Sequence, residues 1–88
     1  MAWQIKYDKK AKKQLSKLPS QDKERIDAKL QEISELENPR ERGKSLQGKY
    51  SDKWRYRIGN YRVICDIRDE ELVILVVQAG HRKEIYKQ

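Results

Sequence analysis

The stretch from Lys53 to Asp66 constrains the fold most, because it reads as two strands joined by a tight turn. Trp54, Tyr56 and Ile58 alternate with basic residues, which is the period-2 pattern of a strand with one buried and one exposed face. Gly59-Asn60 is a two-residue hairpin signal, since glycine tolerates the positive φ that primed turns require. The alternation resumes after this turn, so the stretch predicts a β-hairpin.

The exposed face of this hairpin is cationic. In the register that a two-residue loop imposes, Ile58 faces Tyr61 and Arg57 faces Arg62. Like charges directly opposite each other destabilise a ladder, and a local rule broken without visible compensation often marks a functional site. The face reads either as a solvated polar surface or as a phosphate-binding surface formed by Lys53, Arg55, Arg57 and Arg62.

The distribution of charge favours the second interpretation. The chain carries a formal net charge of +7, and residues 44–62 hold six basic residues against one acidic residue. Such clustering is the electrostatic footprint of a nucleic-acid-binding protein. It is equally suited to docking an acidic protein.

The N-terminal half predicts one strand and two helices. Residues 2–7 alternate as a strand, and Asp8 is a suitable N-cap for a helix through about Leu18. Ser20 is a suitable N-cap for a second helix, which we expect to end near Glu37 because Asn38-Pro39 breaks helices.

The C-terminal half predicts three strands. Residues 40–52 are polar and read as a loop before the hairpin. Residues 72–79 form a nearly unbroken apolar run, which indicates a central strand with the first strand adjacent or across from it. The order is therefore β-α-α-β-β-β. We expect a single α+β domain over residues 1–88, with a small, mostly antiparallel sheet and two N-terminal helices on one face.

Several classes of protein and site are disfavoured. No apolar run is long enough to span a membrane, and the first six residues lack the apolar segment of a signal peptide, so we expect a cytoplasmic protein. The lone Cys65 reads as a core residue in a reducing compartment. One histidine and one cysteine give no metal-ligand set at recognisable spacing, and we expect neither metal nor cofactor.

The available side chains suit RNA cleavage by the RNA's own 2′-OH. This reaction needs charge stabilisation of the phosphorane, which preorganised guanidinium groups supply, and a group that accepts a proton. Arginine cannot be that group because its pKa exceeds about 12. Lys53, crowded by other cations, and His81 are the alternative proton carriers. Tyr86 is either an anchor or a residue that stacks on a base.

Three motifs carry a family resemblance. Leu46-x-Gly48, the run W-R-Y-R-I-G-N-Y-R-V at residues 54–63, and the tail G-H-R-K-E-I-Y at residues 80–86 together resemble the RelE/ParE toxin superfamily, and specifically its RelE branch. The resemblance implies a microbial-RNase-like fold and a ribosome-dependent mRNA interferase. Members of that branch are toxins of toxin-antitoxin pairs that cleave messenger RNA in the ribosomal A site and are held inactive by an antitoxin.

The resemblance also implies roles for individual residues. Lys53 and Arg55 match the basic pair on the first hairpin strand, Arg62 matches the phosphate-stabilising arginine, and Arg82 matches the arginine that stabilises the transition state or protonates the leaving group. Tyr86 matches the tail tyrosine that stacks near the cleavage site. His81 stands where the best-known member has a lysine. We add three residues as RNA-binding: Lys44, Lys49 and Arg57.

Two alternatives remain open at this point. The ParE branch keeps the fold but inhibits DNA gyrase by binding, and a degenerate toxin would bind RNA or its antitoxin without cutting. In each case we expect an acidic, RelB-like antitoxin partner, because a basic surface favours a partner of opposite charge.

Overall fold

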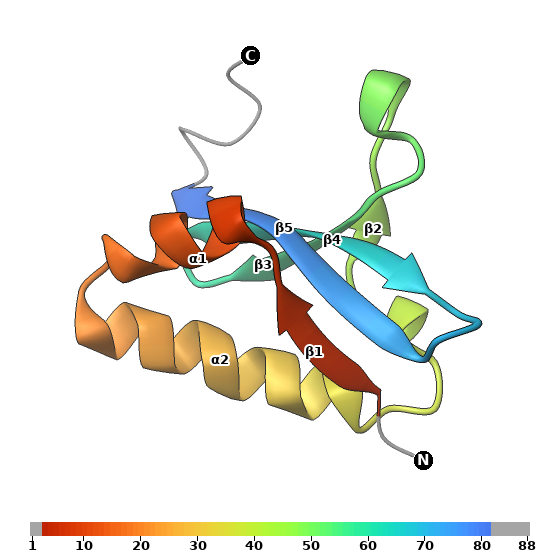
Figure 1. The fold of residues 1–88 in the computed structure, drawn as a ribbon, viewed down its shortest axis with the longest axis horizontal. Helices are drawn as coiled ribbons and strands as arrows, with labels where there is room; N and C mark the ends of the chain where they lie inside the picture. The colour runs from red at the N-terminus through yellow and green to blue at the C-terminus, as the bar shows by residue number, and fades with distance from the viewer. Residues whose placement is uncertain (1–2, 82–88) are drawn as a thin grey trace.

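The computed structural model describes residues 3–81, which fold into one sheet and two α-helices (Figure 1). The strands are β1 (Gln4–Tyr7), β2 (Lys44–Ser45), β3 (Trp54–Ile58), β4 (Tyr61–Arg68) and β5 (Val73–His81). The helices are α1 (Lys9–Ser16) and α2 (Ser20–Ser34), and two short 3-10 helices, η1 (Pro39–Glu41) and η2 (Gly48–Tyr50), lie between α2 and β3.

The sheet has the order β1-β5-β4-β3-β2. β1 runs parallel to β5, and the other three pairings are antiparallel. The expected α+β arrangement is therefore confirmed, and β5 lies between β1 and β4 as its apolar run predicted. The hairpin register is also confirmed, since Ile58 pairs with Tyr61 and Arg57 with Arg62.

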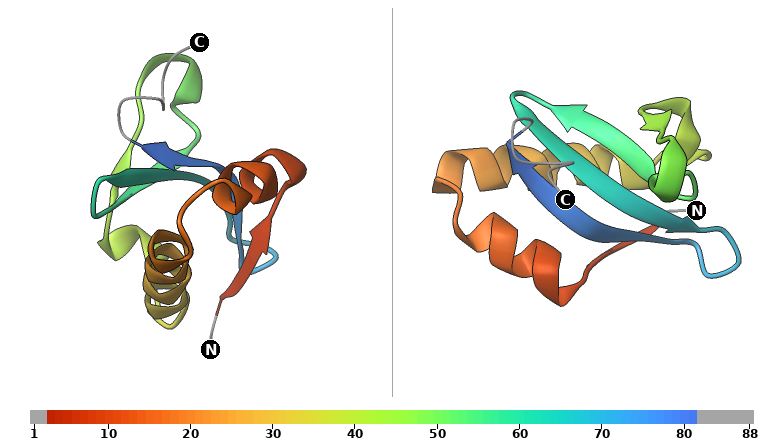
Figure 2. Two further views of the ribbon diagram at one scale, coloured as in Figure 1. Left: turned by 90° about the vertical axis from the view of Figure 1, so that its left-hand side faces the viewer. Right: turned by 90° about the horizontal axis from the view of Figure 1, so that it is seen from above.

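One core joins the helices to one face of the sheet. Ala11 of α1 and Ile26 and Leu30 of α2 are fully buried in the same cluster as Val63 and Ile74 of the sheet. Figure 2 shows α2 under the sheet and α1 beside β1 and β5, while no α-helix of the described residues covers the other face. That uncovered face is the one on which the basic residues of β3 and β4 lie.

The start of α1 follows from its capping residue. The Asp8 side chain accepts a hydrogen bond from the backbone N–H of Ala11 at 2.8 Å, as the sequence predicted. The helix is also held to the sheet, because the Ala79 N–H donates to the Gln14 side-chain oxygen at 2.8 Å. Gln14 thereby provides a partner for the outer edge of β5 beyond the end of β1, where the edge would otherwise lack one.

Two boundary predictions are wrong. Ser20 is the first helical residue of α2, and the N-cap is Pro19, which makes no side-chain capping bond. α2 ends at Ser34, three residues before the expected end at Glu37. Proline fits the start of a helix because its missing N–H is not needed there.

The expected loop at residues 40–52 contains the short strand β2. This strand forms because side-chain donors of β3 hold the preceding segment in place. Trp54 Nε1 donates to the Arg42 carbonyl oxygen at 2.6 Å, and the Tyr56 hydroxyl donates to the Pro39 carbonyl oxygen at 2.8 Å. Gly43 allows the close approach, with φ at +80° and no side chain to collide with β3.

Candidate functional site

Four basic side chains belong to the sheet face without α-helices, which we call the cationic face: Lys44, Arg55, Arg57 and Arg62. They come together because the strand register places them in two rows. Lys44 pairs with Arg55, which pairs with Ile64, and Arg57 pairs with Arg62. Adjacent strands lie about 4.8 Å apart, so neighbouring cations in a row are close enough to contact the same anion.

The floor of the cationic face is buried rather than solvated. Ile64 is 2% exposed, and the Nε atoms of Arg55 and Arg62 are both shielded from solvent. Arg55 Nε has no hydrogen-bond partner within residues 3–81. A shielded, unpartnered donor beside other cations is poised to bind an anion, because the anion would supply the missing acceptor.

Lys53 precedes β3 and forms an ion pair with Asp52. Its Nζ lies 2.8 Å from Asp52 Oδ2, and only 25% of its side chain is exposed. This hydrogen bond from the Lys53 ammonium holds the pKa of the Asp52 carboxyl below its usual value. In this ion pair the Lys53 ammonium is the donor, so the side chain is not placed to accept a proton here.

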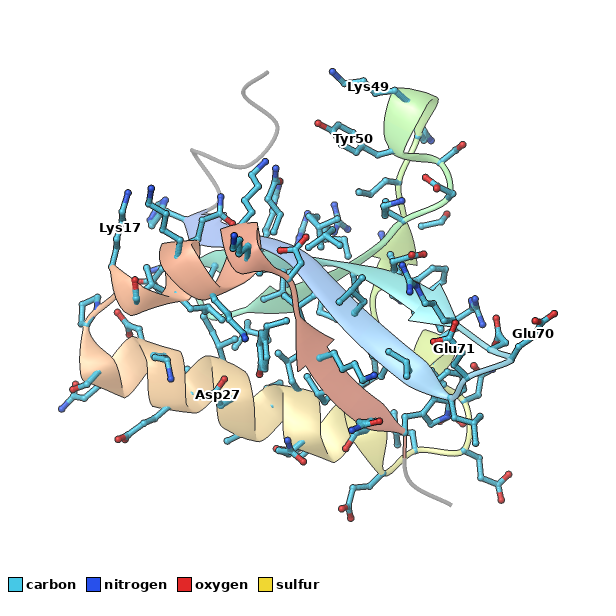
Figure 3. The ribbon with its side chains drawn as sticks, in the orientation of Figure 1. Lys17, Asp27, Lys49, Tyr50, Glu70 and Glu71 are labelled. Atoms are coloured by element: carbon cyan, nitrogen blue, oxygen red, sulfur yellow. The ribbon has the colours of Figure 1, made fainter. Side chains whose placement is uncertain are left out.

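Lys49 lies apart from the two rows. It belongs to η2, whose loop projects away from the sheet on the side opposite α2 (Figure 1). Figure 3 shows Lys49 and Tyr50 at the tip of this loop, and Lys49 Nζ lies 5.4 Å from the centre of the Tyr50 ring. A cation over an aromatic ring at an exposed tip can contact both the backbone and a base of a nucleic acid.

His81, the last residue of β5, is not on the cationic face. It pairs with Tyr61, and their rings meet edge to face with centroids 5.9 Å apart. The Tyr61 hydroxyl donates to Asp22 of α2 at 2.7 Å, so this pair belongs to the face that the helices cover. The structure therefore separates His81 from Arg55 and Arg62. Arg82 and Tyr86, the two other predicted tail residues, lie outside the described residues.

One polar residue of the cationic face was missed by the sequence reasoning. Gln78 of β5 pairs with Ile64 and extends the row that contains Arg55. Its signal was present, because it is the one polar residue in the apolar run at residues 72–79. We interpreted that run as a regular strand buried on both faces, which left no reason to ask where the glutamine points.

Residues 3–81 contain no group of three or more His, Cys, Asp or Glu that could hold a metal ion. Within the same range, none of the helices combines the length and apolar character that crossing a bilayer requires.

Comparison with known proteins identifies relatives along nearly the whole chain. A family model described as the ParE toxin of type II toxin-antitoxin systems, parDE, matches residues 5–86. The mRNA interferase toxin RelE of Escherichia coli is 33% identical over 91 residues, an alignment that covers 100% of this chain and 94% of that protein.

Solved structures agree with these relatives. An arginine double mutant of E. coli RelE in the free state has a TM-score of 0.79 at 29% identity, covering 97% of this chain and 88% of that one. The archaeal RelE of the RelE-RelB complex from Pyrococcus horikoshii has a TM-score of 0.74 at 27% identity, covering 96% of this chain and 99% of that one.

Proposed function

Since this chain belongs to the ParE toxin family of type II toxin-antitoxin systems, we propose that it is the toxin of such a pair and acts as an mRNA interferase. It is an endoribonuclease that cuts messenger RNA in the ribosomal A site and thereby inhibits translation. The 33% identity to a protein named an mRNA interferase supports this activity. The observation that carries the proposal is the buried, cationic floor on which Arg55 and Arg62 lie.

The proposed reaction needs no metal. The 2′-oxygen of the RNA attacks the adjacent phosphorus while its proton leaves, the bond from phosphorus to the 5′-oxygen breaks, and that oxygen takes up a proton. The products are a 2′,3′-cyclic phosphate and a 5′-hydroxyl. Arg55 and Arg62 stabilise the charge that develops on the phosphorane oxygens, which is the largest contribution a protein makes to such a step.

We assign the proton acceptor to Lys53 in its neutral form, which requires that Lys53 first leave Asp52 and release its own ammonium proton to solvent. In this account RNA binding displaces the ion pair, because the negative charge of the RNA repels the Asp52 carboxylate. His81 is disfavoured by its position on the helix-covered face. We propose that Arg82 stabilises the transition state or protonates the leaving 5′-oxygen, as the family resemblance implies. Tyr86 is proposed to stack on a base near the cleavage site.

The partner is an acidic antitoxin. The RelE of Pyrococcus horikoshii was solved as a RelE-RelB complex, and we propose that this chain binds a RelB-like antitoxin that covers the cationic face. The net charge of +7 supports a partner of opposite charge. The ribosome as target implies that the toxin acts in the cytoplasm.

The test is a translation reaction with a defined message, in which cut sites are mapped by primer extension and compared with naked RNA. We expect cuts inside codons that require ribosomes and leave 2′,3′-cyclic phosphate ends. Arg62→Ala should lower the rate about 100-fold, because it removes a preorganised donor to the transition state. Arg25→Ala removes the same charge from an exposed position of α2 and should cut at the wild-type rate.

A second candidate remains because the matching family model is named for ParE. If the folded wild-type protein makes no cuts, the nuclease proposal fails. A DNA gyrase supercoiling assay then distinguishes a ParE-like inhibitor from a degenerate toxin, which would inhibit neither process.

A further inference from the structure

The pairing of β4 with β5 is irregular at one point. Ile64 pairs with Gln78, yet the next residue, Cys65, pairs with Val76. Val77 is therefore left without a partner across the ladder. This is a β-bulge, in which one strand carries an extra residue and the side chains beyond it change direction.

The bulge decides which way Gln78 points. Val76 and Ala79 are both buried in the core, at 0% and 1% exposure, although residues three apart in a regular strand face opposite sides. Val77 is the extra residue that reverses the alternation between Val76 and Ala79. Gln78 therefore lies on the same face as Ile64 and Arg55. Without the bulge, Gln78 would enter the hydrophobic core. Bulges recur beside functional sites because they redirect a side chain in this way.

The Gln78 amide is open to a ligand. The residue as a whole is 8% exposed, yet its amide atoms are not among the side-chain atoms that are both shielded and without a partner. Arg55 Nε, in the same row, is shielded and lacks a partner within residues 3–81. Shielded donors are nearly always hydrogen-bonded, so the Arg55 Nε indicates that a ligand supplies an acceptor in this row, beside the Gln78 amide.

The neighbouring row contains Arg62 and a glycine. Arg62 pairs with Gly80, so β5 presents no side chain beside this arginine. Successive residues on one face of a strand lie about 7 Å apart, which sets the distance between the two rows. A nucleotide whose phosphate contacts Arg62 can therefore bring its base to Gln78.

Resting on the proposed function, we propose that Gln78 contacts the base of a nucleotide beside the cut and sets the nucleotide preference of cleavage. A glutamine amide offers both a donor and an acceptor, so the edge of a base can use both groups, whereas a phosphate uses only the donor. Arginine contacts to phosphate are independent of sequence. Gln78 thus supplies the sequence discrimination that the basic residues lack.

The experiment maps cuts in messages that present all four nucleotides at each position around a site. Gln78→Leu should reduce the preference at one position at least fivefold, because one bidentate base contact supports about five- to 150-fold discrimination. Arg57→Ala should instead slow cutting at every site by the same factor. Gln21→Leu, at an exposed position of α2, should leave rate and preference unchanged.

A second Gln78 variant and an RNA-binding assay make the test decisive. Gln78→Met preserves the length of the side chain, and it replaces Gln78→Leu if that variant fails to fold. An unchanged preference in a folded Gln78 variant that cuts at the wild-type rate overturns the inference while leaving the nuclease intact.

If the wild type binds RNA but does not cut, the proposed function fails. The role of Gln78 is then tested by measuring the affinity for RNA. The affinities for short RNAs of different base composition should then converge in the variant, and unchanged relative affinities overturn the inference. A wild type that neither cuts nor binds RNA overturns both.

Discussion

At the scale of single residues, burial controls the chemistry of Cys65. This thiol is fully buried between the sheet and the helices, and burial raises its pKa well above the ordinary range. The thiolate is the reactive form of cysteine. A neutral, inaccessible thiol is therefore a packing residue, and it takes no part in the chemistry of the opposite face.

Two measurements on Cys65 follow from this. Native protein at pH 8 should not react with a thiol reagent, and unfolded protein should react at once. Because unfolding lets the thiol ionise at its ordinary pKa of about 8.5, the free energy of unfolding should fall as pH rises above that value, by up to roughly 1 kcal/mol per unit. Cys65→Ala should flatten this slope between pH 8.5 and 10. If the unfolding free energy of the variant fell equally steeply with pH, Cys65 would not be the source of the pH dependence.

At the scale of elements, the segment before β3 depends on one glycine. A side-chain carbon at Gly43 would collide with the carbonyl oxygen of Arg55 and approach Trp54 Nε1 to 2.7 Å. Gly48, in the same segment, also has a positive φ but has nothing within 4 Å. The two glycines thus separate the effect of backbone strain from that of close packing.

Gly43→Ala and Gly48→Ala are a matched pair of variants. Gly48→Ala should cost only the strain of a left-handed residue, about 1 kcal/mol. Gly43→Ala adds overpacking and should cost roughly 2–4 kcal/mol while detaching β2 from β3. Urea unfolding monitored by tryptophan fluorescence measures both. Equal losses of unfolding free energy in the two variants would show that the close packing at Gly43 does not contribute to stability.

The same elements show what the sequence could and could not predict. The hairpin at residues 54–68 was predictable because its turn and its alternation are local signals, and the basic residues followed from that register. β2 was not, because it depends on hydrogen bonds from Trp54 and Tyr56 to distant carbonyls. The bulge at Val77 was missed for a similar reason, since only pairing with β4 reveals it.

At the scale of the whole molecule, charge is segregated. Basic residues cluster on the cationic face, on the η2 loop and on α1, whereas Glu70 and Glu71 lie in the turn between β4 and β5 (Figure 3). The Arg40 guanidinium, which bonds the Asp69 carboxylate at 2.8 and 2.9 Å, holds the pKa of that carboxyl below its usual value. Such an uneven field orients an approaching polyanion toward the basic side.

RNA binding should therefore weaken steeply with salt. A plot of the logarithm of affinity against the logarithm of salt concentration should be linear, with a slope set by the number of phosphates contacted. Arg57→Ala should make this slope shallower by about one and weaken binding similarly for all sequences. Fluorescence anisotropy with short RNAs measures both effects. An affinity that does not change with salt would show that the protein does not bind RNA through phosphate contacts.

The parallel pairing of β1 with β5 has a consequence for synthesis. Gln4 and Val73 are register partners, so the first and last described strands must both be present before the sheet and its core can close. Translation delivers the chain from its N-terminus, and pairing between distant segments waits for the later one. The surface proposed to act on ribosomes is thus incomplete until β5 leaves the exit tunnel, which delays its activity toward the ribosome that is making it.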